Sequence, residues 1–246
     1  MLQFMICEEI PLDEISFEND AFRISETLES EPVRRSLSRI GQLNPVVVLD
    51  QGSQRAIVCG FRRVRALRIL GKDRVCARIL SPRDCSVPQA FDLSLWDNLS
   101  HRELNPLEKA RVLTKLQNMC GIPEERLTSF YLPTLGLSSS QAVLRSYLML
   151  DGIHEGLRQC LLAGKLTHLS LDLLAVQTES VQKSVAELMK QVRLSASLQK
   201  KVFNMLEDLA SMTGASFDDP LKEPQARAIL DDAALDIAES HGLAQI

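Results

Sequence analysis

The chain has 246 residues, of which 45% are hydrophobic and 24% are charged, and its formal net charge is −4 at neutral pH. This length suits two domains, and no apolar run approaches the roughly 18 residues needed to span a bilayer, so the composition excludes a membrane protein. The six cysteines form no CxxC pair, which argues against a disulfide framework or a zinc site, and we expect free thiols in a soluble, cytoplasmic protein.

The first part of the chain alternates between strand and helix signals. Short apolar runs between turn residues predict buried strands, and apolar residues three and four positions apart predict helices. In chain order these signals are an edge strand at 10–15, a helix at 32–40, strands at 46–49 and 56–59, a helix from 61 and a strand at 75–80. This order predicts an α+β domain, to which we assign residues 1–90.

The junction between the second buried strand and the following helix has the character of an anion site. The apolar run ends at Gly60, and Phe61 begins the helix at once. The first N–H groups of a helix lack intrahelical partners and carry the positive end of its dipole. Arg62, Arg63 and Arg65 crowd the same end, where positive charge does not help the helix. The pattern therefore predicts a negatively charged ligand at this turn.

Charge is distributed unevenly along the chain. Between Arg34 and Arg83 there are eleven arginines and Lys72, against only Asp50 and Asp73. Arginine forks form paired hydrogen bonds to phosphate oxygens, which a diffuse lysine charge does not. We interpret this arginine block as the anion-seeking part of the protein. A solvated helix face with ordinary surface arginines is the alternative.

The chain beyond residue 88 predicts helices only. The clearest start is at Asn105, a predicted N-cap, which is followed by Pro106 at the first helical position and by Glu108 in the first turn. Two further helices, at 123–132 and 138–150, flank a glycine turn with the spacing of a helix-turn-helix. On this basis the middle of the chain is a separate, all-α domain.

The last predicted part, residues 177–246, has no role that the sequence defines. Apolar residues recur at helical intervals over 179–212, and a further helix is expected at 225–237. Residues 203–246 contain nine acids against two bases. This acidic segment is a candidate to dock on the arginine block of its own or another chain.

Three motifs occur in the order and at the intervals of one known family. They are Gly41-Gln-Leu-Asn-Pro45-Val-Val-Val, Val58-Cys-Gly-Phe-Arg-Arg-Val-Arg-Ala66 and Asp97-Asn-Leu-Ser-His-Arg-Glu-Leu-Asn-Pro-Leu-Glu-Lys-Ala110. Over about residues 10–174 the chain resembles the ParB family of chromosome and plasmid partition proteins. The resemblance implies a ParB/sulfiredoxin-like α+β domain followed by an all-α helix-turn-helix domain at residues 91–176. It also implies a homodimer that binds CTP (or another nucleotide), Mg²⁺ and DNA, has a partition ATPase as partner and associates with the nucleoid.

The resemblance assigns site residues to the glycine-arginine turn and to the third motif. In the family the turn binds the triphosphate of CTP, and an acid and an asparagine of the later motif hold the magnesium ion. The implied nucleotide-binding residues are Gly60, Phe61, Arg62, Arg63, Arg65 and Asn98, and the implied metal ligands are Asp97 and Asn98. Glycine allows close approach of the backbone, arginines contact phosphate, and carboxylate or amide oxygens suit Mg²⁺.

The chain departs from the family pattern at this site. Phe61 stands where the family usually has an acid, and Asp97 stands where it has the longer glutamate. Ser100 and His101 replace a glutamine and an arginine, which removes one expected phosphate contact. We therefore expect nucleotide binding to be retained better than hydrolysis, and leave open whether the protein is a weak CTPase.

The candidate recognition helix is poor in positive charge. Its implied DNA-binding residues are Ser138, Ser139, Ser140, Gln141 and Arg145. Only one of them is basic, and DNA affinity comes largely from neutralising phosphates. We expect weak DNA binding unless a dimer doubles it or the arginine block contributes. The alternative is a helical domain that serves only packing or a partner.

Two functions from other classes remain open. One is an enzyme of the same superfamily, a nucleotide hydrolase or a kinase. Sulfiredoxin carries its cysteine directly after the turn glycine, whereas here Cys59 precedes Gly60, so we expect Cys59 to be a packing residue. The other is a non-enzymatic interaction protein with a degenerate nucleotide site, in which the arginine turn holds an acidic group of a partner.

Overall fold

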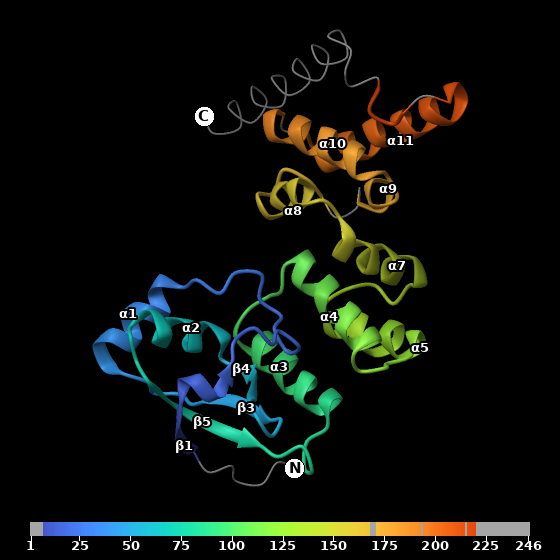
Figure 1. Cartoon of the computed structure of the whole chain (residues 1–246). Helices are drawn as coiled ribbons and strands as arrows, with labels where there is room; N and C mark the ends of the chain where they lie inside the picture. Colours follow the sequence, from blue (N-terminus) through green and yellow to red (C-terminus); the bar gives the residue numbers. More distant parts are fainter. Residues whose placement is uncertain (1–6, 168–170, 193, 215, 220–246) are drawn as a thin grey trace, which may run out of the picture. The chain divides into compact units, whose positions relative to one another are not determined.

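The computed structural model describes residues 7–167, 171–192, 194–214 and 216–219 (Figure 1). The strands are β1 (Cys7–Pro11), β2 (Ile15–Ser16), β3 (Val46–Asp50), β4 (Arg55–Cys59) and β5 (Arg74–Leu80). The longer helices are α1 (Glu31–Ile40), α2 (Phe61–Ile69), α3 (Val87–His101), α4 (Pro106–Asn118), α7 (Gln141–Met149), α8 (Glu155–Leu162), α10 (Glu179–Gln191) and α11 (Ala196–Thr213). Shorter ones are α5 (Glu124–Arg126), α6 (Leu132–Thr134) and α9 (Leu171–Ala175), with a π-helical turn at Leu127–Tyr131 and 3₁₀ turns at Leu12–Glu14 and Leu150–Gly152. Within these described ranges, no helix is both long enough and apolar enough to cross a bilayer.

The strands form one mixed sheet in the order β1-β5-β3-β4-β2. β1 pairs antiparallel with β5 and β3 with β4, while the β3–β5 and β2–β4 pairs are parallel. Val46, Val48 and Ile57 on the central strands are fully buried, because α2 packs on β3 and α3 packs on β4. The predicted α+β class is confirmed for this part of the chain. The edge strand predicted at 10–15 is not one strand: it covers the end of β1, the 3₁₀ turn at Leu12–Glu14 and the start of β2.

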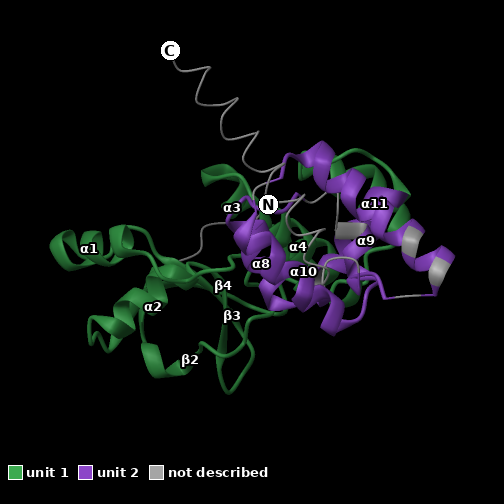
Figure 2. Ribbon diagram, turned by 90° about the horizontal axis from the view of Figure 1, so that it is seen from above, with its two compact units in different colours: residues 1–141 green, residues 142–246 purple. Residues whose placement is uncertain are grey.

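The chain divides into two compact units, residues 1–141 and 142–246, which Figure 2 draws in different colours. α3 and α4 contact each other, and α3 also packs on the sheet, so both helices belong to the first unit. The division into parts at residues 90 and 176 remains a prediction.

α4 begins at the predicted cap. The Asn105 side-chain oxygen accepts the Glu108 N–H at 3.0 Å, and the Glu108 carboxylate accepts the Asn105 N–H at 3.1 Å. This reciprocal arrangement satisfies two donors that a helix start leaves open. Only 2% of Glu108 is exposed, so its charge requires further partners in the interior.

The predicted recognition helix is shorter in the structure than in the prediction. α7 begins at Gln141, so Ser138, Ser139 and Ser140 lie in the loop that precedes it. Serine side chains compete for the local backbone and favour loops before a helix over helix interiors. The placement of these three serines on the helix was therefore wrong.

The predicted helical segment at 179–212 is interrupted. Val192 is extended, and Ser195 caps α11 with its hydroxyl oxygen accepting the Leu198 N–H at 3.3 Å. A serine at this position starts a new helix because it supplies the missing acceptor. The helix expected at 225–237 and most of the acidic segment lie outside the described residues.

Two buried glutamines hold loops of the second unit in the same way. Gln182 is 5% exposed and Gln199 is 1% exposed. Each carboxamide donates to the carbonyl oxygen five residues before it, which closes the loop that leads into its own helix. Each also accepts an N–H from an earlier loop, that of His154 for Gln182 and that of Thr167 for Gln199.

We expect Gln199→Leu to lower the free energy of unfolding by about 2–3 kcal/mol, because buried backbone groups lose their partners while the helix itself is unaffected. Gln182→Leu should have a similar effect. Urea denaturation measures both. Gln191→Leu, at an exposed position of α10, is the control and should change stability by less than about 0.5 kcal/mol. Equal stabilities of all three variants would contradict the assigned role.

Candidate functional site

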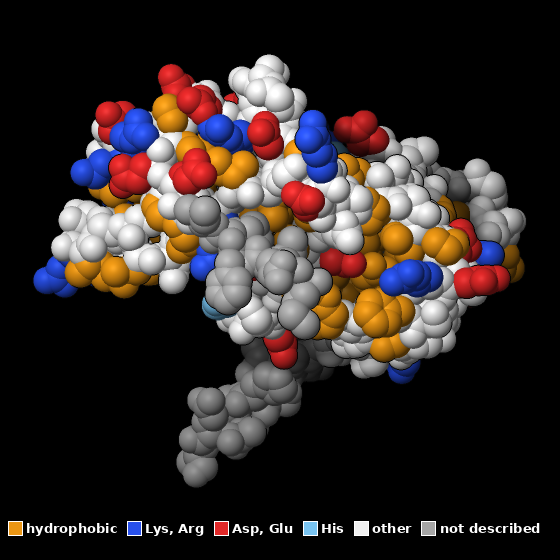
Figure 3. Space-filling model, turned by 90° about the horizontal axis from the view of Figure 1, so that it is seen from below, with side chains coloured by type: hydrophobic (Ala, Val, Ile, Leu, Met, Phe, Trp, Pro, Cys, Tyr) orange, Lys and Arg blue, Asp and Glu red, His pale blue; other side chains and the backbone are white. Residues whose placement is uncertain are grey.

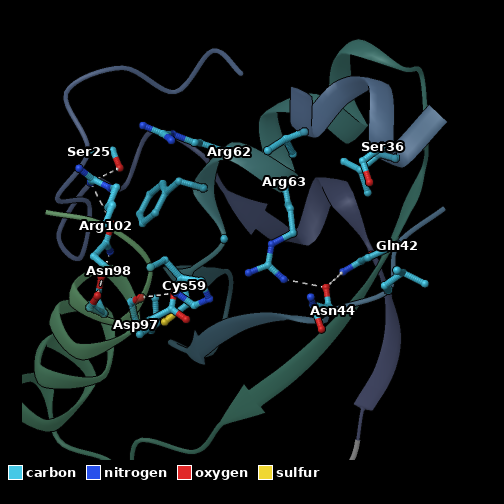
Figure 4. Close-up of a pocket in the computed structure, with 18 of the residues that line it drawn as sticks. Ser25, Ser36, Gln42, Asn44, Cys59, Arg62, Arg63, Asp97, Asn98 and Arg102 are labelled. Atoms are coloured by element: carbon cyan, nitrogen blue, oxygen red, sulfur yellow. Dashed lines mark hydrogen bonds between the residues drawn. The ribbon is translucent and has the colours of Figure 1, made fainter. Parts of the chain in front are cut away.

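A pocket of about 410 Å³ lies in the first unit where α1, α2 and α3 meet the ends of the central strands (Figure 4). Among the predicted site residues it is lined by Gly60, Phe61, Arg62, Arg63, Asp97 and Asn98. The remaining lining comes from residues 24–25, from α1 and the loop after it, from Val58 and Cys59, and from Ser94, His101 and Arg102. The structure thus brings together the two motifs that carried the predicted site.

Gly60 is the N-cap of α2 and has a left-handed backbone, with φ of 102° and ψ of 23°. A Cβ atom placed there would lie 2.7 Å from Cγ1 of Val46, which is closer than real Cβ contacts. Val46 is fully buried and cannot easily move aside. Both the backbone angle and the contact therefore require glycine, and the turn is fixed before any ligand arrives.

Arg62 and Arg63 present unused donors at the start of α2. Arg63 Nη1 donates to the carbonyl oxygens of Asn44 and Pro45, at 2.7 Å each, and Arg62 Nε donates to Thr27 O at 3.3 Å. Among the described residues, both Nη groups of Arg62 and the Nε and Nη2 of Arg63 have no acceptor. In the view of Figure 4 the Arg63 guanidinium lies between Asp97 and Cys59 on one side and Asn44 on the other.

Asp97 supplies the carboxylate of the pocket. No hydrogen bond or ion pair to this carboxylate is found in the described part of the chain, although both Ser100 and His101 bond to the Asp97 backbone oxygen. A carboxylate oxygen is a ligand type that suits Mg²⁺. The side chain of Asn98 is already engaged: its amide donates to Ser94 O at 2.9 Å, and its oxygen accepts from Arg102 at 3.0 Å.

Arg102 is a pocket residue that sequence reasoning missed. Its Nη1 donates to the Glu108 carboxylate at 2.5 Å, and its Nη2 donates to Ser25 Oγ at 3.1 Å as well as to Asn98. It lies four positions after Asn98, a spacing that puts two side chains on one helix face. That spacing was the available signal.

Five of the eleven arginines of the arginine block form ion pairs with acids that lie outside residues 34–83. The partners are Glu9 for Arg74, Glu14 for Arg55, Glu29 for Arg65 and Glu31 for both Arg34 and Arg35. Figure 3 shows basic and acidic side chains interspersed on the face that it draws. Arg65 does not line the pocket and pairs with Glu29 at 2.9 Å, so its predicted contact to a ligand gains no support from the geometry.

Cys59 lies at the end of β4 and is 6% exposed. Burial, assisted by the negative charge of Asp97 and opposed by Arg63, raises the pKa of this thiol from 9.0 to about 12. A thiol acts as a nucleophile through its thiolate, which such a pKa suppresses at neutral pH. The residue is therefore suited to packing, as the sequence predicted, and not to catalysis.

We expect Cys59 in the folded chain to react with a disulfide reagent at pH 8 at least 100-fold more slowly than the exposed Cys7, because a pKa near 12 leaves a thiolate fraction of about 10⁻⁴ and burial blocks access. Because the pKa of Cys59 is higher in the folded chain than in the unfolded chain, the neutral thiol contributes fully to the free energy of unfolding below pH 9. This contribution is lost as the pH rises toward 12. Peptide mass spectrometry after timed labelling measures both sites. Rapid labelling of Cys59 before unfolding would show that the thiol is accessible.

The candidate DNA residues lie around the start of α7. Gln141 and Arg145 are exposed on this helix, and Leu144 and Tyr147 on the same helix are buried. The predicted pattern of buried and exposed positions is thus present. The glycine turn at Leu135–Gly136 and the helical segments 124–134 and 141–149 are also present.

Comparisons with known proteins give consistent relatives, although no family model matches the chain. It is 21% identical over 193 residues to a probable chromosome-partitioning protein ParB of Campylobacter jejuni, covering 78% of this chain and 66% of that one. It is 28% identical over 210 residues to a probable plasmid-partitioning protein ParB of Thermus thermophilus, covering 74% and 69%. A C-terminally truncated Caulobacter crescentus ParB, solved in complex with the centromeric parS site, aligns with a TM-score of 0.43 at 20% identity over 80% of this chain and 99% of that one.

The fold and the pocket define an α+β domain with a pocket that is lined by arginines and by the carboxylate of Asp97. Both relatives carry the name ParB, so the resemblance to the ParB family seen in the sequence motifs is confirmed, and the chain is similar to ParB proteins. It spans about two thirds of the length of these two relatives.

Proposed function

We propose that the first unit binds a nucleoside triphosphate, and that the protein is a nucleotide-dependent DNA-binding protein of partition or regulatory type. The observation that carries the proposal is the pair Arg62 and Arg63, whose unused N–H groups line a pocket at the N-terminus of α2. Phosphate oxygens suit both the arginine forks and the open amides of a helix start. The resemblance of the sequence motifs to the ParB family, which binds CTP, supports CTP as the nucleotide.

Mg²⁺ fits this site as a bridge to the phosphates. Asp97 would hold it directly, and Asn98 would contribute once its oxygen is released from Arg102. The ion would supply positive charge that neutralises the triphosphate. Phe61, which is buried, offers no polar group for activating water, so binding is favoured over turnover.

The DNA-binding part of the proposal rests on α7 and the loop before it. Gln141 and Arg145 are exposed and would contact DNA, together with Ser138, Ser139 and Ser140 from the preceding loop. A helix-turn-helix with a single arginine neutralises few phosphates, so a homodimer and the exposed arginines of the first unit would have to add to it. The names of the relatives support a role in partition. A partition ATPase as partner and the nucleoid as location are what the resemblance to the ParB family implies.

The deciding experiment is isothermal titration of the whole chain with CTP, ATP and GTP in the presence of Mg²⁺, with and without duplex DNA. We expect binding of at least one nucleotide, with CTP the tightest, and a steep loss of DNA affinity as salt is raised. If the chain bound no nucleotide in either condition, the phosphate assignment would be wrong. DNA binding that is absent even at low salt would leave the partner-only function instead.

A further inference from the structure

Ile24 and Ser25 form one wall of the pocket, and the stretch that they begin, residues 24–29, is held by charged side chains. Arg102 and Arg111 hold its first residues: Arg111 donates to the carbonyl oxygens of Ile24 and Ser25 at 3.2 Å each and pairs with Glu26 at 2.7 Å. On the other side, arginines of α2 reach Thr27 and Glu29. This wall is therefore fixed by the helices on both sides of it.

Arg102 uses its donors on the protein and not on the pocket. An arginine has five N–H groups, and four of them sit on the two Nη atoms. Nη1 donates to Glu108 and, more weakly at 3.4 Å, to Glu103 O, while Nη2 donates to Ser25 and Asn98. Its side chain is 26% exposed and that of Glu108 is 3% exposed. An arginine bound in this way orients its neighbours and has little left to offer a phosphate.

The bond to Ser25 determines the direction of that hydroxyl. Because Ser25 Oγ accepts from Arg102, its own proton must point elsewhere. Ser25 lines the pocket, and no acceptor for its proton is found among the described residues. Figure 4 shows Ser25 and Asn98 on either side of the Arg102 guanidinium, with dashed lines to both. Arg102 thus orients both the Ser25 hydroxyl and the Asn98 carboxamide, which line the same pocket.

We propose that Ser25 is a further ligand-binding residue of the pocket and that Arg102 is its positioning residue. Ser25 donates its hydroxyl proton to an anionic oxygen of the nucleotide, and Arg102 acts by holding the acceptor side of that hydroxyl and the carboxamide of Asn98. This inference rests on the proposed nucleotide function and adds to it a donor that the glycine-arginine turn and the metal pair do not include.

The test is a double-mutant cycle in nucleotide affinity, with the whole chain titrated with CTP and Mg²⁺. Ser25→Ala should weaken binding roughly tenfold, the size of one hydrogen bond to a charged group, and should leave the melting temperature close to that of the unchanged protein. The single variant Arg102→Gln should weaken nucleotide binding more than Ser25→Ala does. In the Arg102→Gln background, Ser25→Ala should add less than twofold, because the hydroxyl is no longer directed.

A purely structural role of Arg102 predicts a different pattern. Arg102→Gln leaves the buried Glu108 without its cation and lowers stability, and then Ser25→Ala keeps its full effect in either background. Arg111→Gln serves as the matched control, since it removes a cation from the same wall without a bond to the Ser25 hydroxyl. If the unchanged protein binds CTP and Ser25→Ala binds it equally well, the inference alone fails. If the unchanged protein binds no nucleotide, the inference and the proposed function both fail.

Discussion

Gly60→Ala is expected to lower the free energy of unfolding by about 3 kcal/mol and to abolish measurable nucleotide binding. Two terms add: a residue with a side chain at φ of 102° is strained by about 1–2 kcal/mol, and its Cβ would meet Val46 Cγ1 at 2.7 Å, which costs a further 1–3 kcal/mol as overpacking. Relief of the contact would move the start of α2 and with it Arg62 and Arg63. Urea denaturation and calorimetry measure the two effects.

Gly52→Ala isolates the backbone term, so its difference from Gly60→Ala gives the overpacking term. Gly52 has a similar positive φ of 87°, and nothing lies within 4 Å of a Cβ built there. This control should lose only the backbone term, about 1–2 kcal/mol. In addition, Val46→Ala should recover part of the loss when it is combined with Gly60→Ala. Equal losses in both single glycine variants would mean that Val46 plays no part in fixing the turn.

Arg63→Ala is expected to weaken nucleotide binding by about 2–3 kcal/mol, or roughly 100-fold. The variant removes the Nε and Nη2 groups that face the pocket and also releases the carbonyl oxygens of Asn44 and Pro45, so the loop after α1 loses an anchor. Arg63→Lys should give an intermediate affinity, since lysine keeps the charge but lacks the fork. Calorimetry with CTP and Mg²⁺ measures the affinity.

Arg35→Ala is the matched control for the loss of one positive charge. Arg35 lies on α1, its side chain is 68% exposed, and within the described part of the chain its one ion-pair partner is Glu31 at 3.9 Å. It does not line the pocket. We expect its affinity to stay within twofold of the unchanged protein at physiological salt, because exposed charges are screened. An equal loss in both variants would show that the nucleotide responds to general charge and not to a site at Arg63.

The elements of the first unit could be predicted because their signals are local. The apolar runs at 46–49 and 56–59 are central strands, and Asn105 is the cap of α4. The helix at 138–150 was predicted too long, because Ser138, Ser139 and Ser140 lie in the loop before α7, where serine side chains favour the backbone of a loop. Local patterns define the type of an element well and its ends poorly.

The charge of the arginine block is where prediction from sequence overreached. Counted along the chain, residues 34–83 are almost free of acids, but Glu9, Glu14 and Glu29 lie outside that range and reach three of its arginines. Ion pairs between distant residues depend on which strands and loops come together, and periodicity carries no information about that. Arg62 and Arg63 remain as the two arginines of α2 that face the pocket.

The sequence by itself determined the turn at Gly60, the order of strands and helices, and the kinship with ParB proteins, because each is written in residues close together or in motifs at fixed intervals. Only the tertiary structure decided which arginines are free, that the Asn98 oxygen is held by Arg102, and that Ser25 faces the same pocket. Ser25 lies 77 residues from Arg102 along the chain. Contacts over such separations arise from packing around the sheet, which no local pattern encodes.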